Sequence, residues 1–384
     1  MDNSASTHRG RTLAVLHPAF ALTGVLQAVG GPLMPSIAAA HRLSDSRIGL
    51  LFFLYFAGTS LGAFLSRGNY ARAIALGFFG MAACCVAVAN ASSQLLPLTF
   101  FLLGITVGVP MSGVSLYVGR AYPETCAPML TILNFSWSAG ALLAPIYGAR
   151  VLVHHDYHTA YDLLAIVAVV AGAACVAVVR DAKEPVHLQE SVSRTTTLQL
   201  ILVFALAAFL QVGIENTSAA WLSTFVFRVS GSGIVQAAAA TTFYWVGFLA
   251  SRGVASVILL HLDARRLLQV SVAVALGAAA LLAVAPSSIS RDVAMFVLGV
   301  ALAPIYPLVI AGFFARASHT SHTRWVLFTA GFGGSVLPWI AGWLSAHTGN
   351  LRMGILTIPA ALVVMAGVLP FITIPARTAA GPRS

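Results

Sequence analysis

The sequence predicts an all-α integral membrane protein, with twelve transmembrane helices arranged as two similar six-helix bundles. Three observations lead to this fold class: the composition, the length of the apolar stretches, and a repeat that relates the two halves of the chain. Hydrophobic residues make up 59% of the 384 residues, charged residues make up 8%, and the mean hydropathy is +0.89. Soluble domains contain roughly 45 to 50% apolar residues. The composition therefore excludes an ordinary soluble domain.

Twelve apolar stretches follow one another along the chain, and most of the loops between them are short. A spanning helix needs about 20 predominantly apolar residues. The stretches cover residues 13–36, 48–66, 73–91, 97–119, 126–149, 160–179, 197–225, 234–260, 267–285, 293–315, 325–346 and 354–374. Helices satisfy their own backbone hydrogen bonds inside a bilayer, and the 33 glycines allow close helix contacts. The first stretch is longer than a signal peptide, so we expect it to remain as a helix.

The arginines predict the orientation of the chain. If both termini are cytoplasmic, fifteen of the cationic residues lie inside: Arg9, Arg11, Arg67, Arg72, Arg120, Arg180, Lys183, Arg194, Arg252, Arg265, Arg266, Arg316, Arg324, Arg377 and Arg383. Six lie outside: Arg42, Arg47, Arg150, Arg228, Arg291 and Arg352. This asymmetry is the positive-inside signature. It also explains the net charge of +10 through topology and anionic lipid, and we expect no nucleic-acid partner.

Similar segments recur about half a chain apart. The pairs are residues 62–68 with 247–253, residues 26–30 with 210–213, and residues 140–145 with 333–338. A polar stretch at residues 181–196 separates the halves. We therefore expect an N-terminal six-helix bundle at residues 1–180, a cytoplasmic linker at 181–196, and a C-terminal six-helix bundle at 197–384.

Several segments resemble the fucose/galactose/glucose proton symporter group of the major facilitator superfamily. The first two are Gly24–Pro35 and Gly49–Gly58. Residues 133–145, 212–225, 243–252, 303–307 and 333–338 resemble the group's fifth, seventh, eighth, tenth and eleventh helices. The resemblance implies two bundles of inverted three-helix repeats that rock around a site near the bilayer midplane. It also implies transport of a monosaccharide such as glucose. A single lysine against twenty arginines is typical of a GC-rich bacterial genome, so we expect the bacterial inner membrane.

The chain departs from that group at positions that matter for coupling. The superfamily signature between helices two and three has an aspartate where this chain has Ser66. Some sugar symporters of the group carry acidic residues in helices one and four, where this chain offers Gln27 and Tyr117. Proton coupling would therefore pass through Glu215, the one acidic residue that we place inside a spanning segment.

Glu215 is a functional-site candidate because an ionisable group at membrane depth is expensive to keep. Burial favours the neutral form of a carboxyl, so Glu215 can exchange a proton as its cavity alternates between wet and closed states. It can also accept hydrogen bonds from sugar hydroxyls, beside Gln211 four residues earlier on the same helix face. The structural alternative is that Glu215 pairs with an arginine or caps an unwound turn.

Sugar binding requires amides or carboxylates for the hydroxyls and aromatic faces for the C–H surface of the ring. The candidate polar residues near mid-span are Gln27, Asn134, Gln211, Glu215 and Asn216. The candidate aromatic residues are Tyr55, Tyr117, Trp137, Tyr244, Trp245, Tyr306 and Trp339. Interhelical hydrogen bonding is the alternative for the amides, and packing or an interfacial belt is the alternative for the aromatics.

Other function classes find less support. The chain has no Walker lysine after a glycine loop, no helical metal-binding histidine pair with an acid, and no Gly-x-Ser-x-Gly elbow. We therefore expect no enzyme activity and no cofactor. His154, His155 and His158 fit no metal motif, so we expect a solvated loop. A drug or metabolite exporter and a non-transporting membrane scaffold remain the alternatives. Proton or sodium coupling stays open, and we expect a monomer in contact with lipid.

Overall fold

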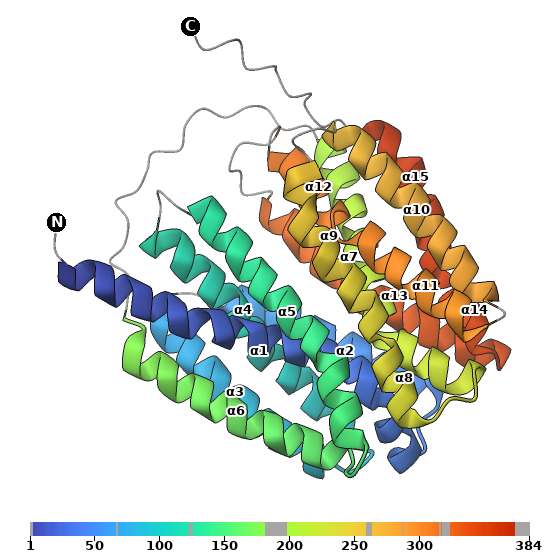
Figure 1. The fold of residues 1–384 in the computed structure, drawn as a ribbon, viewed down its shortest axis with the longest axis horizontal. Coiled ribbons are helices and arrows are strands. Elements are labelled where there is room, and N and C mark those ends of the chain that lie inside the picture. The colour runs from blue at the N-terminus through green and yellow to red at the C-terminus, as the bar shows by residue number, and fades with distance from the viewer. Residues whose placement is uncertain are drawn as a thin grey trace, which may run out of the picture.

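The computed structural model describes residues 3–66, 68–122, 126–180, 198–258, 263–285, 287–314, 316 and 323–372. Helices are the regular elements throughout this part of the chain. The N-terminal bundle contains α1 (Asn3–His41), α2 (Asp45–Leu65), α3 (Tyr70–Asn90), α4 (Leu96–Ala121), α5 (Cys126–Leu152) and α6 (Tyr157–Val178). The C-terminal bundle contains α7 (Leu198–Val229), α8 (Ile234–Ala240), α9 (Thr242–Ile258), α10 (Ala264–Val284), α11 (Ser288–Leu302), α12 (Ile305–Phe314), α13 (Thr323–Thr348), α14 (Leu351–Ile355), α15 (Thr357–Val368) and the short η2 (Leu369–Phe371). Figure 1 shows the two bundles beside each other.

The helices account for the twelve predicted spans. Within the described residues, eleven segments are long and apolar enough to cross a membrane, and three of them join two helices: α8 with α9, α11 with α12, and α14 with α15. The 26-residue α13 packs against α2 and α7 and completes the set. The predicted fold class is therefore confirmed. The predicted linker at residues 181–196 lies outside the described residues, so the bundle boundaries stay a prediction.

The same helix pairing occurs in both bundles. In the N-terminal bundle α1 packs on α5, α2 on α4, and α3 on α6. In the C-terminal bundle α7 packs on α13, α9 on α11, and α10 on α15. Two glycines make equivalent contacts: a Cβ at Gly104 would lie 2.0 Å from the Tyr55 carbonyl oxygen, and one at Gly299 would lie 2.0 Å from that of Tyr244. Tyr55 and Tyr244 therefore occupy equivalent positions in the two halves.

The two bundles contact each other through α1 with α7 and α8, α2 with α13, and α5 with α8 and α9. We call the end of the molecule where α1 meets α2 and α7 meets α8 the distal end (Figure 1). There Asp45 of α2 forms an ion pair with Arg228 of α7. The Ser345 hydroxyl of α13 donates to Asp45 Oδ2 at 2.6 Å. These contacts join the bundles through one carboxylate.

Three acidic residues besides Glu215 belong to the described spanning helices. Asp45, Asp162 and Asp292 all lie within the first two turns of α2, α6 and α11. From the sequence we expected Asp162 in the external loop between the fifth and sixth spans, but α6 already begins at Tyr157, so Asp162 belongs to the helix. Glu215 is the acidic residue of this set that lies near the middle of its helix.

Candidate functional site

Glu215 lies near the middle of the unbroken helix α7, and its side chain is partly buried. Arg252 and Tyr244 of α9 and Tyr306 of α12 are close enough to interact with it electrostatically. We call Glu215, Tyr244, Arg252 and Tyr306 the central cluster. Within the described part of the chain, the Glu215 carboxylate forms no hydrogen bond and no direct ion pair. The predicted arginine pairing thus exists only at longer range, and α7 has no unwound turn for Glu215 to cap.

Arg252 connects the central cluster to the N-terminal bundle. Its Nη1 donates a hydrogen bond to the Ser138 hydroxyl of α5 at 2.8 Å. Its guanidinium carbon lies 4.5 Å from the ring centre of Phe248 and 5.5 Å from that of Trp137. A cation over an aromatic face is attracted by the ring quadrupole within about 6 Å. The side chain is therefore held where α5 and α9 meet.

Aromatic rings continue the same contact between the bundles. The rings of Trp137 on α5 and Trp245 on α9 are 6.1 Å apart in an edge-to-face arrangement. Trp245 also packs against Tyr244 at 5.1 Å and against Phe248 at 5.4 Å. The predicted aromatics Trp137, Tyr244 and Trp245 therefore lie together beside Arg252, although they come from different halves of the chain.

Three polar atoms around Arg252 are buried without a hydrogen-bond partner: Arg252 Nε, the Tyr244 hydroxyl and Trp137 Nε1. Buried polar groups in proteins are nearly always hydrogen-bonded, and each exception needs an explanation. Two of these atoms can only donate and the third can donate or accept. The arrangement can thus bind a polar solute that supplies acceptors.

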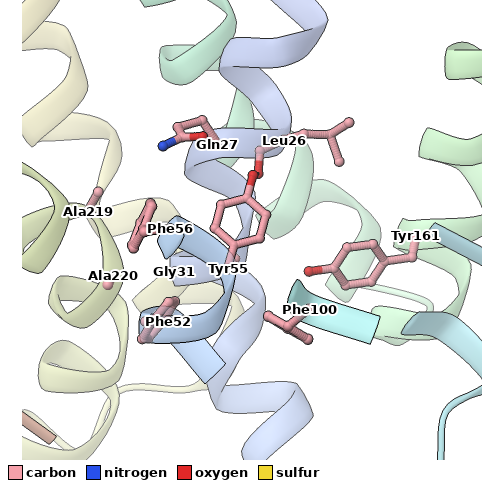
Figure 2. Close-up of a pocket in the computed structure, with 11 residues that line it drawn as sticks. Leu26, Gln27, Gly31, Phe52, Tyr55, Phe56, Phe100, Tyr161, Ala219 and Ala220 are labelled. Atoms are coloured by element: carbon pink, nitrogen blue, oxygen red, sulfur yellow. The ribbon is translucent and has the colours of Figure 1, made fainter. Parts of the chain in front are cut away.

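Gln27 and Tyr55 lie in a different place, at a small cavity of the α1, α2 and α4 interface that Ala219 and Ala220 of α7 close (Figure 2). The cavity has room for about one water molecule. The Tyr55 hydroxyl donates to the Leu26 carbonyl at 2.8 Å, and Gln27 Oε1 is buried without a partner. No hydrogen bond or ring contact among the described residues joins these two side chains to the central cluster.

Two predicted amide residues hold the C-terminal bundle together. Gln211 Nε2 donates to the Leu302 carbonyl at 3.0 Å, where the break between α11 and α12 begins. Asn216 Nδ2 donates to the Gly334 carbonyl at 3.4 Å and so links α7 to α13. Both bonds are of the interhelical kind that the sequence left as an alternative.

The remaining predicted residues lie away from the cluster or at its edge. Asn134 is exposed on α5 and donates to the Leu130 carbonyl of its own helix. Tyr117 is buried in α4. Trp339 of α13 is 40% exposed and makes an edge contact with Phe53. Of these three, none is brought to Glu215 by a contact among the described residues.

The first two residues of α6 contribute to packing at the distal end, and His158, which we expected in a solvated loop, is one of them. The Tyr157 hydroxyl and His41 Nε2 are 2.6 Å apart, and His158 Nδ1 bonds to the Ala89 carbonyl. These contacts join α6 to α1 and α3. Among the described residues, no three His, Cys, Asp or Glu side chains are arranged to hold a metal ion.

Sequence reasoning did not include Arg252 among the candidate site residues and counted it only among the cations of the cytoplasmic side. The repeat pairs Arg252 with Arg67, and Arg67 lies two positions beyond the end of α2 at Leu65. Helix α9, however, continues for six residues past Arg252 to Ile258. At 1.5 Å per residue, this adds about 9 Å of helix between Arg252 and the loop. The signal available in sequence was the apolar stretch itself, whose predicted end at residue 260 already lay beyond Arg252.

Comparison with known proteins identifies relatives over nearly the whole length. The Major Facilitator Superfamily matches residues 16–324. The chain is 22% identical over 377 residues to a glucose/galactose transporter of Brucella abortus biovar 1 (strain 9-941), with 91% of each chain covered.

Solved structures show the same fold. A bacterial homolog of the human lysosomal transporter Spinster, in an inward-facing and occupied conformation, is similar with a TM-score of 0.75 and 14% identity. The similarity covers 95% of this chain and 97% of that one. The nucleoside transporter NupG has a TM-score of 0.75 at 12% identity, covering 94% of this chain and 99% of that one.

Proposed function

Because this chain belongs to the major facilitator superfamily, we propose that it carries a monosaccharide such as glucose by alternating access to a site around the central cluster. The observation that carries the proposal is that Glu215, Arg252, Tyr244 and Tyr306 gather where α5 and α9 of the two bundles meet. The similarity to a glucose/galactose transporter over 91% of the chain supports a sugar as the solute.

The chemistry of the cluster suits a polyhydroxylated ring. Hydroxyl groups need both donors and acceptors, and the Glu215 carboxylate accepts while Arg252 Nε and the Tyr244 hydroxyl can donate. The indoles of Trp137 and Trp245 offer apolar faces for the C–H surface of a sugar. A few convergent polar groups among aromatic walls are typical of small-molecule sites.

The position of the cluster also suits alternating access. Arg252 belongs to one bundle and its partner Ser138 to the other, so rocking of the bundles changes the lining of the site. Following the arginine distribution, we place both termini in the cytoplasm and the distal end outside, in a bacterial inner membrane. The Asp45–Arg228 contact then closes the site toward the outside in this conformation.

We also propose that Glu215 carries a proton with the solute. Among the described residues the Glu215 carboxylate has no direct ion-pair partner, and a carboxyl with no such partner is free to gain and lose a proton as its surroundings change. The helix-one and helix-four positions that are acidic in some sugar symporters are occupied by Gln27 and Tyr117 here. Among the described residues, this leaves Glu215 as the carboxylate near the middle of a spanning helix.

The test compares Glu215→Gln with wild type in proteoliposomes. We expect the variant to exchange labelled glucose for unlabelled glucose but to lose accumulation driven by a pH gradient. Asp162→Asn is the matched control, because it removes an exposed carboxylate at the start of α6. Accumulation that persists in Glu215→Gln would contradict the coupling role. Wild-type protein that exchanges no hexose would contradict sugar transport, and stabilisation by lipophilic cations instead would favour an exporter.

A further inference from the structure

The guanidinium of Arg252 has an unused hydrogen-bonding edge. Nη1 is bonded to Ser138, whereas Nε is buried and has no partner. The rings of Phe248 and Trp137 lie near the guanidinium, so they shield it from water without accepting its hydrogen bonds. The edge formed by Nε and the adjacent Nη2 is the one that a planar two-oxygen group can occupy.

A buried charge in this position needs a partner. Removing a cation from water is costly unless an opposite charge or a set of hydrogen bonds compensates for the lost hydration. Within the described residues, the carboxylate with which Arg252 interacts is Glu215, and the two do not touch. The hydroxyl of Ser138 supplies one hydrogen bond and no charge. Arg252 therefore has an unused hydrogen-bonding edge and a charge without a direct ion-pair partner among the described residues, and an anionic group can satisfy both.

We propose that Arg252 is a carboxylate-binding residue and that the transported monosaccharide is a sugar acid whose carboxylate takes the open edge of this guanidinium. The inference rests on the proposed sugar transport and names the class of sugar. Arginine binds a carboxylate through two parallel N–H···O bonds, which adds orientation to affinity. Such a contact would fix one end of the sugar at the junction of α5 and α9.

Two further unpartnered groups point to the same ligand. Tyr244 is fully buried with a free hydroxyl, and Trp137 is 8% exposed with a free Nε1. Tyr244 lies within electrostatic range of Arg252, and the Trp137 ring lies against its guanidinium. These donors can bind the ring oxygen and hydroxyls of a sugar whose carboxylate sits on Arg252.

The charges of the cluster favour a monoanion. The groups facing Arg252 are Glu215 from α7, Tyr244 from its own helix and Tyr306 from α12. With Glu215 protonated and the tyrosines neutral, the cluster carries one positive charge. A bound monocarboxylate brings the net charge of the site to zero. The bundles can then change conformation around the loaded site without a net buried charge.

The experiment compares D-glucuronate with D-glucose, which share a ring and differ by a carboxylate at C6. Affinities are measured by thermal stabilisation of the purified full-length protein and by counterflow in proteoliposomes. We expect wild type to bind glucuronate about 10- to 100-fold more tightly than glucose, as for a charge-assisted bidentate pair. The neutral methyl ester of glucuronate should lose this preference. The ester tests the wild-type protein and does not depend on the folding of a variant.

Substitutions locate the preference at one side chain. Arg252→Lys keeps the charge but lacks the planar fork, so it should lose most of the preference for glucuronate. Arg252→Gln should bind both sugars with similar affinity. Arg150→Gln removes an exposed arginine at the end of α5 and should keep the wild-type preference.

The outcomes distinguish the carboxylate-binding role of Arg252 from the proposed transport of a sugar. Binding of glucose with no preference for glucuronate overturns the assignment of Arg252 and leaves sugar transport intact. A preference that survives in Arg252→Gln, or that the methyl ester retains, also overturns it. Binding of neither sugar, acidic or neutral, overturns both this inference and the proposed function.

Discussion

Neutralising Asp45 should open the distal end of the molecule. The Asp45 side chain is 10% exposed and that of Arg228 is 36% exposed, and Ser345 adds a hydrogen bond of 2.6 Å to the same carboxylate. Hydrogen bonds to charged groups contribute about 1.5 to 3 kcal/mol each. Because Arg228 is exposed by more than a third, we discount the ion pair to about 1 to 2 kcal/mol. Asp45→Asn keeps an acceptor for Ser345 and removes the charge.

This energy corresponds to a shift of about 5- to 30-fold in the ratio of closed to open distal ends. The shift can be measured by electron spin resonance distances between labels at His154 and Ser288, which are exposed at the distal end of opposite bundles. The native cysteines are replaced beforehand. We expect a longer-distance population to grow in Asp45→Asn and in Arg228→Gln.

A double-mutant cycle tests the reasoning. If the two residues act as one pair, the double variant should shift no further than either single variant. Arg47→Gln is the matched control, because Arg47 is exposed in the same turn and its side chain forms no hydrogen bond or ion pair with the other bundle among the described residues. Additive shifts, or an equal shift in Arg47→Gln, would refute the assignment of a cross-bundle pair.

Two further predictions concern the stability of the bundles. Gly299→Ala should lower the melting temperature by several degrees, because overpacking costs about 1 to 3 kcal/mol and the added Cβ would lie 2.0 Å from the Tyr244 carbonyl oxygen. The control is Gly277→Ala, whose Cβ meets nothing within 4 Å and which should be neutral or slightly stabilising. Equal melting temperatures of the two variants would contradict the close approach at Gly299. Gln211→Leu should destabilise the C-terminal bundle by about 1 to 2 kcal/mol, because the Leu302 carbonyl loses its donor, and unchanged unfolding in detergent would show that water replaces the amide.

The candidate site was predictable from sequence only in part. Glu215 could be singled out because a carboxylate in an apolar stretch is conspicuous without any knowledge of its neighbours. Gln211 was equally conspicuous, but its bond to Leu302 depends on where the chain breaks between α11 and α12. Trp339 looked like the other aromatics, yet the rotation of α13 leaves it 40% exposed. Polarity along the chain identifies candidates, whereas helix rotation decides which of them face one another.

Arg252, in contrast, belongs to the site but was not recognised as a candidate from the sequence. Its position in a repeat made it look like a surface residue, because the matching segment after α2 ends its helix just before Arg67. The two halves share their helix pairing, but α9 extends further than the repeat implied. Because α9 continues for six residues past Arg252, this arginine lies inside the helix and at the contact between the bundles.

The sequence by itself determined the fold class, the number of spans and the presence of two similar halves. These follow from composition and from the length of apolar stretches, since a bilayer imposes the same requirement on every spanning segment. Only the tertiary structure decided which side chains meet. Arg252 and Ser138 are 114 positions apart, and Arg228 and Asp45 are 183 apart. Contacts across such separations depend on how whole bundles pack, and the local pattern of a sequence does not contain that information.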